Sequence, residues 1–226
     1  IASEVSQQVY KLTPIIHNEL VVRDKLSGMA VNGSLCLIDR ILNNSSSKDL
    51  GMEGYPAEFG MYLSIIKKNN LHKKVNNEYK LVAPNKKIKE LKHLYDDFIR
   101  LIKSKDRPIS ISELYTLFTK QPYGLKKGLI PILLAAFIKV NEGLMALYSI
   151  DEQQTETLIT EFSNRVCERF IYTPESLKIM YVKIEGEKEV LLNDFKTYVE
   201  VKYLNGRKIK DPTPLNVLKP IVVRAY

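Results

Sequence analysis

The strongest constraint on this chain is a helix-length apolar segment that directly follows a short basic turn. The turn contains Pro122 and Gly124 and carries Lys126 and Lys127. The apolar segment that follows, 129–138, has no polar side chain. In a helix at a protein surface, polar residues recur every three to four positions and form a polar face. We therefore expect this helix to be buried on most sides and to serve as a packing hub, which leaves the two lysines at its entrance to reach a partner.

The length and composition are those of an ordinary globular protein. With 226 residues, the chain can form one large domain or two small ones, and it has the hydrophobic content (45%) to build a core. No apolar run approaches the roughly 18–20 residues of a membrane span. Cys36 and Cys167 are isolated in sequence, which predicts free thiols in a reducing compartment. We expect a soluble, cytoplasmic protein without membrane contact.

The net charge of +8 is concentrated in one segment. Between Lys67 and Arg107 the chain has thirteen Lys or Arg and five Asp or Glu, whereas the two signs balance elsewhere. A localised positive surface attracts phosphate backbones in a salt-dependent manner, or it attracts an acidic partner. The alternative is a solvated lysine-rich face that keeps the protein soluble. The excess of Lys over Arg indicates weak rather than specific phosphate recognition.

The candidate nucleic-acid-binding residues are lysines of this segment and of the basic turn. If DNA is contacted, we expect the contacts to go to phosphates, because the apolar helix offers no polar side chain to base edges. Sequence specificity should then be poor. The candidates are Lys67, Lys68, Lys73, Lys74, Lys86, Lys87, Lys126 and Lys127.

Apolar periodicity predicts a mainly α fold with a few short β-strands, beginning with a helical subdomain over 1–85. Ser27 is a candidate N-cap, and Pro14 is suited to the first turn of a helix. The expected elements of this subdomain are helices over 15–22, 28–42 and 55–66, and one short strand over 78–83.

The next segment, 86–184, is predicted to form a winged-helix-like domain, because three helices are followed by a strand. Ser110 or Ser112 can cap the second helix, and Gly143 can close the third. The expected elements are helices over 88–102, 111–118 and 129–142, a strand over 144–150, a helix over 155–171 and a strand over 178–184.

Residues 185–226 are predicted to form a truncated C-terminal helical segment. A helix is expected over 187–204, and the apolar run 215–223 has barely started when the sequence stops. The first ten residues show a helical spacing that enters from upstream. We interpret the chain as an excised piece of a longer protein.

No motif in the sequence supports catalysis, a cofactor or a metal. Patterns for a P-loop, a zinc protease, paired C-x-x-C ligands and a nucleophile elbow are absent. His17, His72 and His93 are dispersed; His17, beside Asn18 and Glu19, is a candidate acid–base group, but a structural role is the expectation for it. Asp96 and Asp97 diverge by about 100° on a helix, which is poor geometry for a shared metal. We predict a non-enzymatic module.

Three motifs carry a resemblance to a known family. Pro14–Ser27 reads P-x-x-x-N-E-L-x-x-R-x-x-L-S, the segment from Leu50 reads L-G-x-x-G-x-P, and Pro122–Leu134 reads P-Y-G-L-K-K-G-L-I-P-I-L-L. In this order they are similar to the middle region of large bacterial AAA+ ATPases of phage defence, the BREX-associated and related families. The resemblance implies a nucleotide-binding domain upstream and assigns no catalytic residue here. Lys126 stands where such proteins have Arg, which weakens bidentate phosphate contact.

Two functions remain open from the sequence. The first is a non-catalytic, winged-helix-like module of a defence ATPase, which binds DNA backbone non-specifically or couples the ATPase to other defence-system subunits. The alternative is a protein-interaction or scaffold module of the same parent, without nucleic-acid contact. A stand-alone winged-helix regulator and a hydrolase have less support from the residues.

Overall fold

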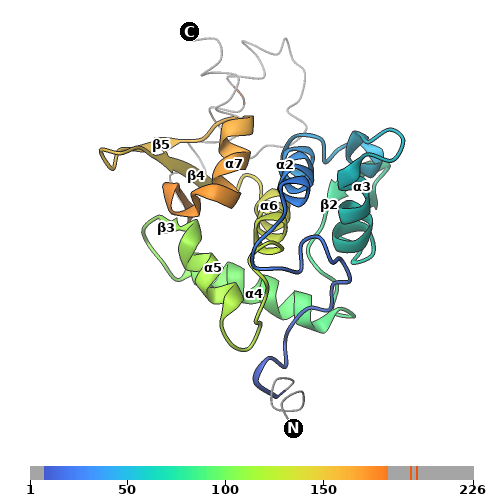
Figure 1. The fold of residues 1–226 in the computed structure, drawn as a ribbon. Helices are drawn as coiled ribbons and strands as arrows, with labels where there is room; N and C mark the ends of the chain where they lie inside the picture. Colours follow the sequence, from blue (N-terminus) through green and yellow to red (C-terminus); the bar gives the residue numbers. More distant parts are fainter. Residues whose placement is uncertain (1–7, 183–193, 195–196, 198–226) are drawn as a thin grey trace.

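Six α-helices and two small antiparallel sheets make up the described part of the computed structural model (Figure 1). The structure describes residues 8–182 together with 194 and 197. With 46% of residues helical and 14% in strands, it agrees with the predicted mainly α class with a few short strands. The elements predicted over 187–204 and 215–223 lie outside the described residues, and the predicted domain boundaries stay predictions.

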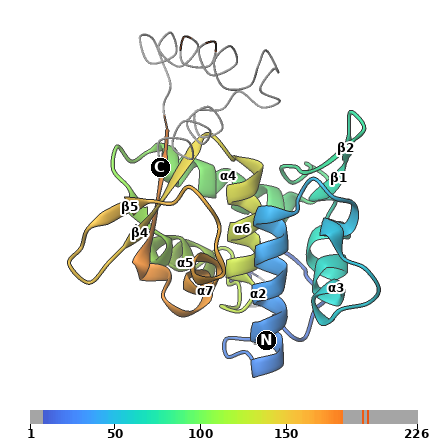
Figure 2. The same cartoon turned by 90° about the horizontal axis from the view of Figure 1, so that it is seen from above.

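Helix α6 (Ile130–Val140) lies at the centre of the core, as the apolar segment predicts. Every residue from Ile130 to Ile138 is buried. Helix α2 (Gly28–Asn43) packs along α6, and strand β2 (Glu78–Leu81) contacts it as well. Figure 2 shows α6 between α2 and α4. Because full burial of a large apolar side chain contributes about 1.5–3 kcal/mol, this helix is a main source of stability.

Aromatic rings join α6 to the two helices that precede it. Phe137 lies 5.1 and 5.5 Å, between ring centroids, from Tyr95 and Phe98 of α4 (Lys89–Lys103). Its ring is also 6.2 Å from that of Phe118, in α5 (Ile111–Thr119). The pairs of Phe137 with Tyr95 and Phe118 are edge-to-face, and such pairs add about 0.5–1.5 kcal/mol each beyond the burial of area.

The two helices predicted over 28–42 and 55–66 are confirmed, the second with a change of helix type along its length. Ser27 caps α2, since its hydroxyl accepts the backbone N–H of Ala30 at 3.3 Å. Helix α3 (Ala57–Met61) continues into one π-helical turn, Tyr62–Lys67. A hairpin of β1 (His72–Val75) and β2 follows; the sequence predicted only its second strand.

The predicted helix over 15–22 is wrong, because this segment consists of turns and irregular backbone. The side chain of Asn18 accepts the backbone N–H of Leu20 at 3.1 Å, and its carbonyl accepts the N–H groups of Val21 and Val22. Asn side chains that bond nearby backbone in this way favour turns over helix. The segment 15–22 therefore forms a turn in place of the predicted helix.

The second half of the described chain places its strands in one four-stranded antiparallel sheet. The strand order is β3-β6-β4-β5. Helix α7 precedes β6 in sequence and lies beside the sheet in Figure 1. The bounds are β3 (Ile109–Ser110), β4 (Met145–Ile150), β5 (Glu156–Leu158), α7 (Asn164–Tyr172) and β6 (Leu177–Tyr181).

The predicted helix over 155–171 is wrong in its first half. The carboxylate of Asp151 accepts the backbone N–H of Thr155 at 2.8 Å, and Gln154 has a left-handed φ of 65°. This turn sends the chain back along β4, so that Glu156–Leu158 pairs as a strand. Helix α7 begins only at Asn164. Of the two serines predicted to cap α5, Ser110 is the N-cap, and it forms a capping box with Glu113.

Two segments about a hundred residues apart, 10–28 and 120–131, are bonded together, and we call this contact the motif junction. The ammonium of Lys126 is 2.9 Å from a carboxylate oxygen of Asp24. The backbone N–H of Gly128 donates to the carbonyl of Arg23 at 3.0 Å, and that of Leu12 donates to the carbonyl of Pro122 at 3.1 Å. The first and third sequence motifs thus meet in space.

Gly128 is required at the motif junction by close approach. A Cβ there would lie 2.5 Å from Leu26 Cδ2 and 2.7 Å from the carbonyl oxygen of Val21. Gly128→Ala should therefore lower the free energy of unfolding by about 1–3 kcal/mol, measured by urea denaturation. Gly60→Ala is the control, because a Cβ there meets nothing within 4 Å; in a helix it should be neutral or stabilising by about 0.5–1 kcal/mol. Equal stability of the Gly128→Ala protein and the wild type would contradict the close packing of the two segments.

Candidate nucleic-acid interface

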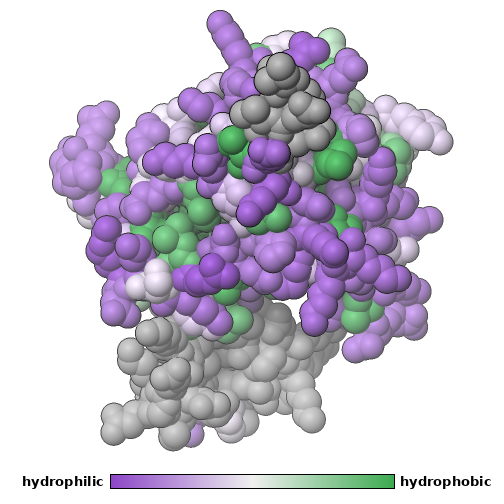
Figure 3. Space-filling model, turned by 90° about the horizontal axis from the view of Figure 1, so that it is seen from below, coloured by the Kyte–Doolittle hydropathy of each residue, from purple (hydrophilic) through white to green (hydrophobic). Residues whose placement is uncertain are grey.

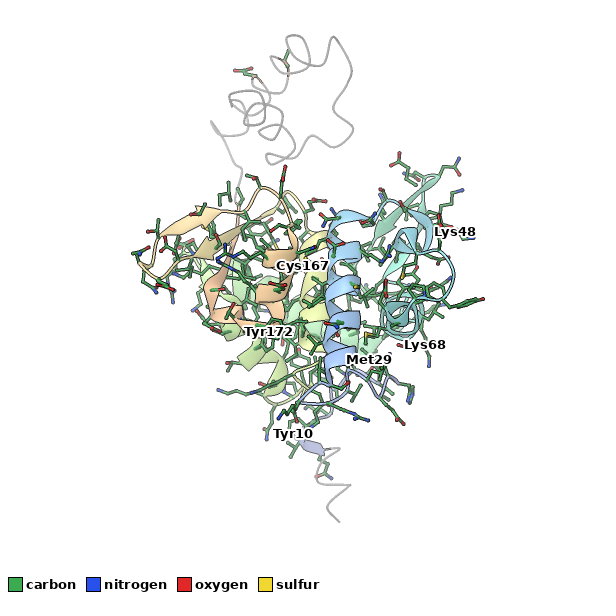
Figure 4. All side chains as sticks on the ribbon, turned by 45° about the horizontal axis from the view of Figure 1, so that its top comes forward. Tyr10, Met29, Lys48, Lys68, Cys167 and Tyr172 are labelled. Carbon is green, nitrogen blue, oxygen red and sulfur yellow. The ribbon has the colours of Figure 1, made fainter. Side chains whose placement is uncertain are left out.

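The structure places the eight predicted lysines at two separate locations. Lys126 and Lys127 lie in the loop before α6, where both contact Asp24 at the motif junction. The other six lie in the β1/β2 hairpin or in the segments on either side of it. Figure 4 shows Lys68 on the α3 side of the molecule. The six are Lys67 and Lys68 before β1, Lys73 and Lys74 in β1, and Lys86 and Lys87 between β2 and α4.

The hairpin brings two lysines face to face. Its turn, Asn76-Asn77, has positive φ values of 51° and 70°, as two-residue hairpin turns require. The strand register pairs Lys73 with Lys80. Like charges directly opposite each other destabilise a sheet. The pair therefore does not serve stability, and Lys80, which sequence reasoning missed, belongs to the candidate site.

Most of these lysines have no internal partner. Six exposed lysines in and beside the hairpin enter no ion pair with another described residue; we call them the hairpin lysines. They are Lys68, Lys73, Lys74, Lys80, Lys86 and Lys87. Lys67 differs, because its ammonium donates to Asp49 at 2.8 Å and lies 6.0 Å from the ring centroid of Tyr62. Lys67 therefore supports the site and is not a free contact.

A buried histidine anchors the base of the hairpin. His72 is only 5% exposed, and its Nε2 lies 2.9 Å from the carbonyl oxygen of Ser45. Since a carbonyl only accepts, Nε2 carries the proton of the neutral ring. The other nitrogen, Nδ1, is 2.9 Å from the Tyr62 hydroxyl. These contacts tie β1 to the loop after α2 and to the helix before the hairpin.

The Tyr62 hydroxyl has one proton and faces two acceptors. Besides His72 Nδ1, it lies 3.2 Å from a carboxylate oxygen of Asp49. Because Nε2 carries the ring proton, Nδ1 accepts a hydrogen bond from the Tyr62 hydroxyl, and burial lowers the pKa of His72, which favours this neutral ring. The Lys67 ammonium then compensates the Asp49 carboxylate and lowers its pKa. Burial raises the pKa of Tyr62, which keeps the phenol protonated.

This anchor holds a strained loop. Asp49 and Leu50 have left-handed φ values of 48° and 55°, a conformation that costs non-glycine residues of order 1–3 kcal/mol each. Leu50 is fully buried, and the Asp49 side chain accepts a hydrogen bond from the Lys67 ammonium. The hydrogen bonds under the hairpin and the burial of Leu50 thus fix the backbone from which the hairpin starts.

The two cysteines line one cleft between α2 and α7, together with Asp39 and Glu168. Burial raises the pKa of Cys36 and raises that of Cys167 to about 12. Since the thiolate is the nucleophilic form, both thiols are poor nucleophiles at neutral pH. Among the described residues, no group of three or more His, Cys, Asp or Glu is arranged to hold a metal ion.

Comparisons with models of protein families, with characterised proteins and with solved structures gave no match. In the described part of the chain, every helix is too short or too polar to cross a membrane. The resemblance to defence ATPases, the cytoplasmic location and the role of the lysines stay predictions.

The buried His72 makes stability depend on pH. Because its folded pKa lies below the ordinary value near 6.5, the unfolded chain binds a proton that the folded chain does not. The stability that the neutral, buried His72 gives the folded state is complete above the unfolded pKa. It is lost as the pH falls from the unfolded pKa through the lower, folded pKa. Urea denaturation should therefore show a lower free energy of unfolding at about pH 5.5 than at about pH 7.5.

His72→Gln should reduce this pH dependence, whereas His93→Gln, at an exposed position, should leave it unchanged. The same pH dependence in the His72→Gln protein and the wild type would mean that His72 is not held neutral by burial.

Proposed function

We propose that this chain is a non-catalytic module of a larger defence ATPase that contacts DNA through phosphates at the β1/β2 hairpin. The observation that carries the proposal is the lysine pair Lys73 and Lys80, which face each other across an exposed hairpin. Neither lysine has an acidic partner within the described residues. A phosphate between the two ammonium groups converts a repulsive pair into an attractive site.

The order of elements from α4 to β6 supports a winged-helix-like interpretation. A helix, a short strand, two helices and a further strand occur in sequence as α4, β3, α5, α6 and β4. Strand β6 lies between β3 and β4, as the last strand of a winged helix does. In this interpretation β5 and α7 are an insertion between the last two strands, and the β4–β5 turn takes the place of the wing.

The buried position of α6 argues against base reading. In a helix-turn-helix protein, the second helix of the motif enters the major groove and presents polar side chains to base edges. Helix α6 occupies that position in the chain, but Ile130–Ile138 are buried and α2 packs along them. The proposed contact therefore goes to the phosphate backbone through lysines, without sequence specificity.

A protein-interaction module is the second candidate, and exposed apolar side chains favour it. Tyr55, Ile15 and Met29 are 92, 76 and 72% exposed. Figure 3 shows small apolar patches among hydrophilic side chains on the face seen from below. Exposed apolar side chains that form a contiguous patch are typical of contact surfaces, whereas scattered single ones are common on any protein. This second function is compatible with coupling to the rest of the ATPase.

Charge reversal at the hairpin tests the proposal. Binding of a fluorescent duplex of about 20 base pairs is measured by anisotropy between about 50 and 200 mM salt. The triple variant should lose at least about tenfold in affinity at the lowest salt, and its salt dependence should flatten because phosphate contacts are lost. The substitutions are Lys73→Glu, Lys74→Glu and Lys80→Glu.

A matched triple variant changes the net charge equally at exposed positions away from the hairpin, and it should lose much less affinity. Its substitutions are Lys11→Glu, Lys120→Glu and Arg165→Glu. Equal loss in both variants would mean that only net charge matters. If the wild type binds neither duplex nor single-stranded DNA at about 50 mM salt, the DNA proposal fails and the interaction module becomes the better account.

A further inference from the structure

A half-open cleft of about 580 Å³ lies beside the motif junction. This volume is within the range of about 300–1,000 Å³ that ligand sites occupy. The first motif contributes Asp24, Lys25 and Leu26 to its walls, and the third contributes Lys127 and Pro131. Helices α2, α5 and α7 complete the cleft. In Figure 4, Met29 and Tyr172 mark the ends of α2 and α7 that flank it. The DNA proposal makes no use of this region.

The inner wall of the cleft is largely apolar. Its apolar side chains come from the loop before α2, from α2 itself, from α6, and from α7 and the turn after it; they are Leu26, Val31, Pro131, Ile171 and Pro174. Tyr115 also lines the cleft, and its hydroxyl donates to the carbonyl of Phe170 at 2.6 Å. An apolar ligand group therefore has a surface to pack against.

The threonine hydroxyl groups of the cleft already donate their hydrogen bonds within the protein. Those of Thr116 and Thr119 donate to carbonyls of their own helix, at 3.2 and 2.8 Å. Their oxygen lone pairs remain as acceptors only. Among the side chains of the cleft, the lysines at the rim are therefore the hydrogen-bond donors that a ligand can use.

The rim of the cleft carries a net positive charge, since Lys25 and Lys127 line it together with a single acid, Asp24. Asp24 is engaged by the ammonium of Lys126 and by the backbone N–H of Lys127, at 2.9 and 3.4 Å. These contacts lower the pKa of Asp24 and keep it ionised. The side chains of Lys25 and Lys127 are exposed and enter no ion pair in the described part of the chain. A carboxylate is an anionic group that these ammonium groups can bind through charge-assisted hydrogen bonds.

We propose that the cleft binds a peptide segment of a partner protein in which an acidic residue lies beside an apolar side chain. The apolar side chain enters between Leu26, Val31 and Ile171. The carboxylate reaches the ammonium groups of Lys25 and Lys127. A peptide fits better than a small molecule because the cleft is half-open, whereas small-molecule sites bury about 70–90% of the ligand surface. The proposal is independent of DNA binding.

The probe is a fluorescein-labelled, amidated tetrapeptide of alternating Glu and Leu, titrated into the whole chain and followed by anisotropy and by amide chemical shifts. We expect saturable binding, with shifts at the motif junction and in α5. The isosteric Gln-Leu peptide should bind at least about tenfold more weakly, because the carboxylates are lost. Equal binding of both peptides would overturn the proposal.

Two kinds of variant locate the site. Lys25→Glu with Lys127→Glu should weaken binding at least about tenfold by reversing the rim charge. Thr116→Trp should also weaken it, by filling the cleft from an exposed position. Lys120→Glu makes the same kind of charge change on the same loop, outside the cleft lining, and should bind normally.

Far-ultraviolet circular dichroism establishes that each variant is folded. If the reversed-rim and filled-cleft proteins, both folded, bind like the wild type, the assignment of the site is wrong. The charge-reversed hairpin variant should keep its peptide binding. Loss of peptide binding there would place the peptide on the hairpin lysines and overturn the cleft, whereas loss of DNA binding alone concerns only the proposed function.

Discussion

A helix without a polar face must be covered on all sides, and here both halves of the described chain supply the cover for α6. Helix α2 and strand β2 contact it from the first half, and the rings of α4 and α5 contact Phe137 from the second. One hydrophobic cluster consequently runs from Ile16 to Ile179. The hairpin and the motif junction are both fixed to this shared core, since β2 touches α6 and the junction includes the loop that enters it.

The positive charge of the chain has different roles at different places. Lys67 and Lys126 form internal ion pairs with Asp49 and Asp24, and they hold backbone segments in place. The hairpin lysines lack such partners, and two of them repel each other across the strand pair. Exposed ion pairs contribute at most about 1 kcal/mol each. The arrangement therefore makes better sense as a contact surface fixed to a rigid base than as a device for stability.

The sequence predicted those elements whose signals are local. Ser27 and the apolar spacing after it were sufficient for α2, and the unbroken apolar segment was sufficient for the burial of α6. The helix over 15–22 failed because the Asn18 side chain accepts the backbone N–H of Leu20 and stabilises a turn there. Likewise, β1 and the role of Lys80 depend on strand pairing. The role of His72 depends on Tyr62 and Ser45, which no residue pattern links to it.

Helix α6 belongs to one core shared by both halves of the described chain, and native-state hydrogen exchange measures whether the two halves unfold together. Ile41→Ala in α2 removes a fully buried side chain from the first half and should cost about 2–5 kcal/mol. If the core is shared, the slowest amides of α6, β4 and β6 should lose as much protection as those of α2. Loss of protection confined to the first half, with α6 and the four-stranded sheet unchanged, would contradict the account.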